Sequence, residues 1–154
     1  MRVRFNIGSY HFFISVYRTG KVTGVNSKLP SGRHFLMWDF DDTPMNVVKQ
    51  SLSYVQKKWR LAPIYIVNTG LHDYYHAYCF SAKDWGTTLH ILADTPELDQ
   101  MFFRIGVVRG YFTLRYTPKR NRDFKPALIL GSTVREDINP YEICSFITYN
   151  TKRR

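Results

Sequence analysis

The segment HFLMWDFDD, residues 34–42, is an apolar run that ends in carboxylates. Side chains alternate between the two faces of an extended strand, so Asp39 and Asp41 point the same way, about 6 to 7 Å apart. Two carboxylates on one face repel each other, and a divalent cation held by oxygen ligands would offset that repulsion. The segment therefore predicts a buried strand that carries a pair of acidic side chains at its end.

A structural role for these acidic residues is the alternative. Thr43 and Pro44 follow at once, and this pair is typical of a helix start with Thr at the N-cap and Pro at the first helical position. Asp42 is then explained as a negative charge near a helix N-terminus. Asp39 lies inside the apolar run and has no such explanation. These residues alone leave a metal-binding or catalytic role and a structural role both open.

The composition is that of a folded, basic protein. Aromatic residues make up 16% and charged residues 22% of the 154 residues, which predicts a single globular domain over residues 1–150 and a basic tail over residues 151–154. The 22 Lys and Arg against 12 Asp and Glu give a net charge of +10, which favours nucleic acid or nucleotides as partners. The two cysteines show no metal-binding spacing. Without a signal peptide or a long apolar run, the protein is expected to be soluble and cytoplasmic, with no membrane contact.

The hydrophobic pattern predicts an α+β fold. Apolar residues recur at helical spacing over residues 44–59, which indicates an amphipathic helix directly after the acidic strand. The order of elements suggests an RRM-like core, a mainly antiparallel sheet flanked by helices on one side. The remaining expectations are strands over 2–7, 10–17, 63–68, 75–80, 110–116 and 125–131, helices over 83–93, 96–107 and 140–149, and a loop over 18–33.

A second motif, NTGLHDYYHAY over residues 68–78, places a turn with a glycine between two predicted strands. His76 stands at the start of the second strand, where it could hold a triphosphate or orient a nucleotide. A lone histidine beside aromatic residues is more often packed and hydrogen-bonded to the backbone. By itself, the motif therefore favours a structural histidine.

A third motif, RGYFTLRYTPKRNR over residues 109–122, alternates cationic and aromatic residues. On a strand, the alternation puts Arg109, Tyr111 and Arg115 on one face, and cations beside π-faces suit phosphates and bases. The alternative is a half-exposed strand that leads into a solvated basic loop. The net charge of the chain favours the binding interpretation.

In this order, the three motifs resemble the catalytic core of archaeo-eukaryotic-type primases and primase-polymerases. That family has a strand that ends in Asp-x-Asp or Asp-x-Glu, then a turn and strand with a small-x-His motif, then a third acidic residue and a strand with Arg and Lys. WDFD over residues 38–41 matches the first motif, and the turn that leads to His76 looks like the second. Arg115 and Lys119 match the basic strand, so the resemblance spans roughly residues 33 to 120.

The resemblance implies a metal-dependent nucleotidyltransferase that acts in DNA replication on nucleoside triphosphates and a single-stranded DNA or RNA template. Its third acidic residue falls at Asp99, with Asp94 and Glu97 as alternatives. The implied catalytic and metal-binding residues, for two Mg²⁺ or Mn²⁺ ions, are Asp39, Asp41 and Asp99. The implied phosphate-binding residues are His76, Arg115 and Lys119, and the surrounding nucleic-acid surface comprises Arg109, Tyr111, Arg120, Arg122 and Lys125.

The chain carries neither a zinc-binding insertion nor a helicase domain, so the resemblance is to a minimal, stand-alone core of the kind expected on a mobile element. A helicase or another replication protein is the expected protein partner. Three alternatives remain: a catalytically degenerate relative that only binds nucleic acid, a metal-dependent nuclease, and a plain RNA-recognition-like module. The last of these would need aromatic residues on a sheet face and no pair of aspartates.

Overall fold

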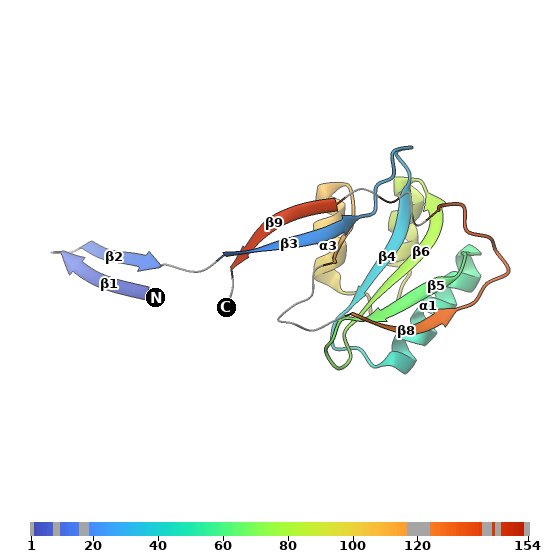
Figure 1. Cartoon of the computed structure of the whole chain (residues 1–154), viewed down its shortest axis with the longest axis horizontal. Coiled ribbons are helices and arrows are strands. Elements are labelled where there is room, and N and C mark those ends of the chain that lie inside the picture. The colour runs from blue at the N-terminus through green and yellow to red at the C-terminus, as the bar shows by residue number, and fades with distance from the viewer. Residues whose placement is uncertain are drawn as a thin grey trace.

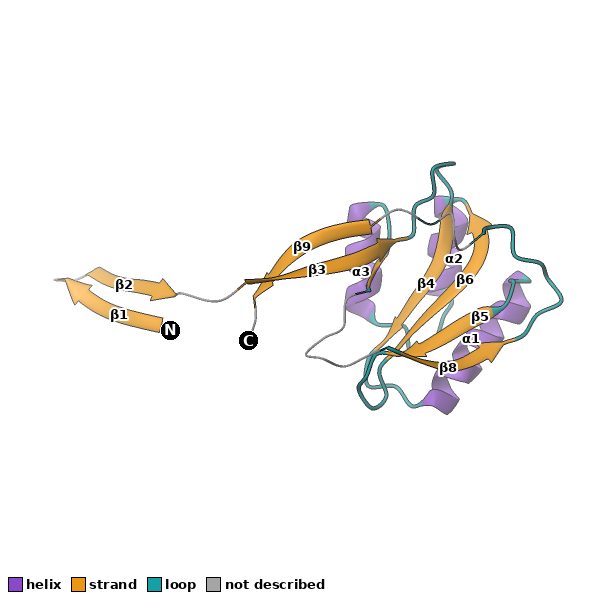
Figure 2. Cartoon of the chain, viewed as in Figure 1, coloured by secondary structure: helices purple, strands orange, loops and turns teal. Residues whose placement is uncertain are grey.

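Antiparallel strands and helices make up the part of the chain that the computed structural model describes, residues 2–7, 10–15, 19–116, 124–139, 143 and 146–152 (Figures 1 and 2). The strands fall into three sheets with the orders β1-β2, β7-β3-β9 and β4-β6-β5-β8. The strands are β1 (Arg2–Ile7), β2 (Tyr10–Ser15), β3 (Thr19–Asn26), β4 (His34–Phe40), β5 (Ile64–Asn68), β6 (Tyr75–Lys83), β7 (Thr113–Arg115), β8 (Lys125–Leu130) and β9 (Phe146–Lys152). The helices are α1 (Met45–Trp59), α2 (Trp85–Ala93) and α3 (Gln100–Arg109).

The four-stranded sheet confirms the α+β fold and the RRM-like core. The run β4-α1-β5-β6-α2 places β6 between β4 and β5, and all pairings in this sheet are antiparallel. Helices lie behind the sheet in the view of Figure 1, while its front face carries none of the described helices. None of the described helices is long and apolar enough to cross a lipid bilayer.

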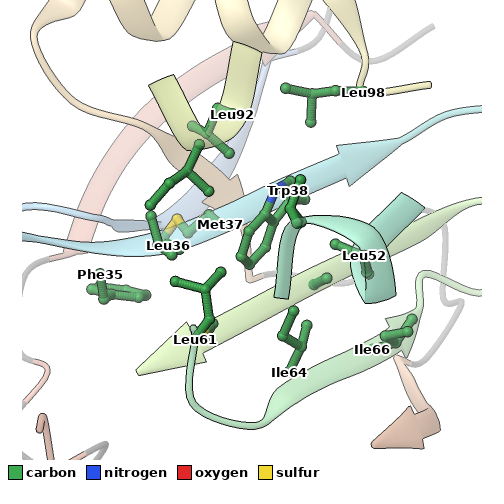
Figure 3. Packing of buried hydrophobic residues seen from close by; sticks show 14 of the residues in the cluster. Phe35, Leu36, Met37, Trp38, Leu52, Leu61, Ile64, Ile66, Leu92 and Leu98 are labelled. Carbon is green, nitrogen blue, oxygen red and sulfur yellow. The ribbon is translucent and has the colours of Figure 1, made fainter. Parts of the chain in front are cut away.

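Trp38 lies at the centre of the core between the four-stranded sheet and its helices (Figure 3). Its side chain is fully buried, and its indole N–H donates to Thr95 Oγ1 at 2.9 Å. Ala77 pairs with Trp38 across the strands and with Ile66 on the other side, so these three residues share the helix-facing side of the sheet. Odd-numbered β4 residues, Asp39 among them, therefore face the front.

The three-stranded sheet corrects two predictions. Residues 18–33 were expected to form a loop, but residues 19–26 form β3; residues 140–149 were expected to form a helix, but residues 146–152 form β9. The two strands pair with each other, from Thr19 opposite Lys152 to Val25 opposite Phe146. Residues 151 and 152 belong to β9 and pair with Gly20 and Thr19.

Glycine at position 24 belongs to this sheet rather than to a loop. A Cβ atom there would lie 2.5 Å from Thr113 Cγ2 on the neighbouring strand β7. The glycine is thus required by close packing of two strands, a use that local sequence patterns do not distinguish from a turn. The predicted pair of N-terminal strands is confirmed as β1 and β2, which pair with each other.

The ends of two helices also differ from expectation. Pro44, not Thr43, is the N-cap of α1, because the buried Thr43 hydroxyl donates to the Asp41 carbonyl instead. Arg109 is the last residue of α3, not part of a strand. Gly110 ends that helix with a left-handed backbone, φ 75°, and the strand that was predicted from residue 110 begins at Thr113.

We expect Gly106→Ala to destabilise the protein by about 1 to 3 kcal/mol, although alanine ordinarily favours helix. An added Cβ at Gly106 would lie 2.1 Å from the ring of Phe112, which is buried and packs against α3 through Phe102 at 5.1 Å between ring centroids. Gly86→Ala is the matched control, since its nearest neighbour would lie 3.4 Å away. Urea unfolding of both variants measures the effect, and equal stability of the two would contradict this packing argument.

Candidate active site on the front of the sheet

Asp39 and His76 are direct cross-strand partners on β4 and β6, at the front of the four-stranded sheet. Asp39 Oδ1 lies 3.6 Å from His76 Nε2. The Asp39 side chain is 25% exposed and that of His76 is 10% exposed, so both are largely withdrawn from water. The structure therefore joins the first and second sequence motifs into one site.

Negative charges gather around Asp39. The pKa of Asp39 is raised to about 7, chiefly by burial and to a smaller extent by the negative charges of Asp41 and Asp99. Asp41 follows β4 and is exposed, whereas Asp99 is held by a backbone hydrogen bond from its N–H to the Asp39 carbonyl at 3.0 Å. All three predicted acidic residues thus act electrostatically on one place in the fold.

Burial lowers the pKa of His76 to about 4, with a smaller contribution from the positive charge of Arg115. The imidazole is therefore neutral at physiological pH and carries one N–H. His76 Nδ1 is buried and has no hydrogen-bond partner among the described residues. A buried, unpaired ring nitrogen costs free energy and is suited to meet a polar group of a ligand.

Two loops frame the acidic end of this site. Asp42, after β4, and Asp73, before β6, both have left-handed backbones with φ of 54° and 61°. The Thr43 N–H donates to the Asp73 carbonyl at 2.9 Å, which ties one loop to the other. Asp42 therefore lies in the turn that leads the chain away from β4. Its charge was predicted to favour the start of the following helix, but the first turn of α1 contains no acidic residue.

The alternatives for the third acidic residue lie elsewhere. The carboxylate of Asp94 accepts from the Trp59 indole at 2.9 Å and pairs with Lys58 at 2.8 Å, so it serves contacts to α1. Glu97 is exposed and has a left-handed backbone, φ 58°. Asp99 has a structural task as well, because its Oδ1 caps α3 by accepting from the Phe102 N–H at 2.5 Å.

The basic residues of the third motif divide into three groups. The positive charge of Arg115 contributes to the lowered pKa of His76, and the residue is positioned by its pairing with Gly24 of β3. Arg109 is exposed at the end of α3, Tyr111 is half-buried in the turn before β7, and Lys125 is exposed at the start of β8. The predictions for Lys119, Arg120 and Arg122 lie outside the described residues.

The donor chemistry at this site fits a hard divalent cation in part. Carboxylates crowded enough to raise the pKa of Asp39 would be relieved by a cation with oxygen ligands. Within the described residues, however, no three acidic, histidine or cysteine side chains converge as a ready-made metal-binding group. Asp39 and Asp41 are the residues that would hold such an ion, with Asp99 contributing its charge from the cap of α3.

Sequence reasoning missed the aromatic residues that continue this face of the sheet. Tyr78 pairs with Met37 on β4 and with Tyr65 on β5, two residues along the strands from the Asp39–His76 pair. Tyr65 also lies 5.6 Å from Phe80 between ring centroids. The alternation of side chains between the two faces of strands 64–68 and 75–83 indicates that these rings share a face. Strand register was needed to place them on the same face as Asp39.

Comparison of the chain with protein-family models, with curated protein sequences and with solved structures gave no match.

Proposed function

We propose that the protein is a metal-dependent nucleotidyltransferase of the primase or primase-polymerase type, which acts on nucleoside triphosphates and a single-stranded template. The observation that carries the proposal is the raised pKa of Asp39 beside two other carboxylates and the unpaired His76. A largely buried carboxylate near other negative charges is costly in a protein that only needs to fold, and strongly shifted pKa values concentrate at functional sites.

Each residue has a task in this proposal. A divalent ion bound there would supply Lewis-acid activation of the α-phosphate and of the attacking 3′-hydroxyl. Asp39 and Asp41 would hold that ion, while His76, neutral at its lowered pKa, would donate one hydrogen bond to a phosphate oxygen. The Arg115 guanidinium would neutralise phosphate charge at the same place.

The decisive experiment is a template-directed extension assay with Mn²⁺ or Mg²⁺, labelled nucleotides and a single-stranded template. We expect product from the wild type and a loss on the order of a thousand-fold in the Asp39→Ala/Asp41→Ala protein. The exposed Asp42→Ala is the matched control and should keep activity, because its carboxylate lies in the turn beyond the site. Equal product from the wild type and the double variant, with both folded, would refute the proposal.

A second candidate is nucleic-acid binding without catalysis. It is favoured by the aromatic rings of Tyr65 and Phe80 on the front of the sheet and by the use of Asp99 as a helix cap. In that case the template would bind to the wild type and to the Asp39→Ala/Asp41→Ala protein alike, and neither would form product. The two candidates therefore differ in a single pair of measurements.

A further inference from the structure

Two rows of side chains run across the front of the four-stranded sheet. One row contains Asp39, His76, Val67 and Pro126, each the cross-strand neighbour of the next. The parallel row contains Met37, Tyr78, Tyr65 and Ile129, paired in the same way. The rows are two residues apart along β4, β6 and β5, so about 7 Å separates the row of Asp39 and His76 from the aromatic row on these strands. On β8 they are three residues apart, because the pairing with β5 shifts register there.

The aromatic row becomes more open toward β8. Met37 is fully buried, Tyr78 and Tyr65 are half-buried, and Ile129 is 61% exposed at the outer strand. An exposed isoleucine directly opposite a tyrosine makes a flat apolar surface that water covers poorly. Among the described helices, none lies over this face in Figure 1.

The Tyr65 ring is held in place. The interaction of its hydroxyl with Glu136 raises the pKa of Tyr65, and its ring lies 5.6 Å from that of Phe80 between centroids. A ring fixed in this way loses little conformational entropy when a flat ligand stacks on it. The positive charge of Arg115 acts on His76 in the row of Asp39. Lys125, at the start of β8, pairs with Asn68, one residue beyond that row, and so belongs to the other face of the sheet.

We propose that Tyr78, Tyr65 and Ile129 form a stacking surface for the bases of a single-stranded nucleic acid whose phosphates lie along the row of His76. The surface offers rings for bases next to the Arg115 cation for phosphates, the combination that binds single strands without sequence preference. The net charge of +10 matches a polyanionic occupant. The inference rests on the proposed function, because it places the template strand beside Asp39.

Binding of labelled oligothymidylate in metal-free buffer, followed by fluorescence anisotropy, tests the surface. We expect Tyr65→Ala to weaken binding about tenfold, while Tyr65→Phe, which keeps the ring and loses only the hydroxyl, stays within about twofold of the wild type. An abasic oligonucleotide of the same length should bind all three proteins equally, because it has phosphates and no bases. Equal losses on both oligonucleotides, or no loss with Tyr65→Ala, would overturn the proposal.

A second pair of variants keeps the test independent of the packing of Tyr65. Ile129→Glu and Val108→Glu make the same change in charge at exposed positions, 61% and 88% exposed, on β8 and on α3 behind the sheets. The first should weaken oligothymidylate binding about tenfold and the second by less than about twofold. Equal effects of the two would overturn the proposal. Loss of extension activity with this pattern intact would refute only the proposed catalysis.

Discussion

The Asp39→Asn protein is expected to be more stable than the wild type at pH 8 in EDTA, and to have lost nucleotidyl transfer. The carboxyl has a pKa of about 7 in the folded protein against 3.8 as the ordinary value, so the folded state holds the proton more tightly than the unfolded state. The free energy of unfolding therefore falls as the pH rises from about 4 to 7, by at most about 4 kcal/mol. Asparagine removes this cost together with a metal ligand.

Urea unfolding at pH 4 and at pH 8 measures the effect. The two proteins should have similar stability at pH 4, where the wild-type carboxyl is protonated in the folded state, and diverge as the pH rises. Asp41→Asn is the control: its side chain is exposed, so its effect on stability should be below about 1 kcal/mol. Identical curves for the wild type and Asp39→Asn would contradict the raised pKa.

Added Mn²⁺ separates the catalytic explanation from a purely structural one. A cation that binds only the folded protein raises its stability, so the wild type should gain in melting temperature at pH 8 and Asp39→Asn should not. A gain in both proteins would place the metal elsewhere. The loss of stability on ionisation of Asp39 and the proposed activity thus both depend on the same carboxylate.

Trp38→Ala is expected to cost about 3 to 5 kcal/mol, the largest loss from any single core position. The side chain is fully buried at the centre of the core, and its removal also leaves the Thr95 hydroxyl without the indole donor at 2.9 Å. A loss of that size lowers the melting temperature of a protein of this length by about 6 to 20 °C.

Trp59→Ala is the matched control for this prediction. Trp59 also makes an indole hydrogen bond, to Asp94 at 2.9 Å, but its ring is only half-buried on α1. Its replacement should cost about 1 to 2 kcal/mol, since less apolar surface returns to water. Circular dichroism is the suitable probe, because both changes alter tryptophan fluorescence. A smaller loss at Trp38 than at Trp59 would mean that the core is centred elsewhere.

Local patterns predicted the elements whose periodicity is strong and whose partners are near in sequence. Residues 44–59 were expected to form a helix and α1 spans residues 45–59, while the strands expected at 63–68 and 75–80 are β5 and β6. The local pattern did not predict β3 and β9, because these two strands pair with each other although most of the chain lies between them in sequence. Gly24 was assigned to a loop for the same reason, since β7, the strand that packs closely against it, is remote in sequence.

The candidate site could be predicted in part. The spacing of Asp39 and Asp41 and the position of His76 after a turn were visible in the sequence, and the structure places Asp39 opposite His76. The contribution of Asp99 depends on a backbone hydrogen bond to β4 that no local pattern encodes. Tyr65 escaped notice because its neighbours across the sheet follow from strand register alone.

The pairing of β3 with both β7 and β9 has a consequence for the order of folding. The hydroxyls of Thr23 and Thr148 lie 3.3 Å apart although 125 residues separate them in the chain. Closing so long a loop carries a large entropic cost, whereas β5 and β6 are joined by a short turn and form early. Arg115 pairs with Gly24 of β3, so its position depends on a strand that belongs to this same sheet. Synthesis must therefore reach the last strand before the sheet that holds this cation is complete.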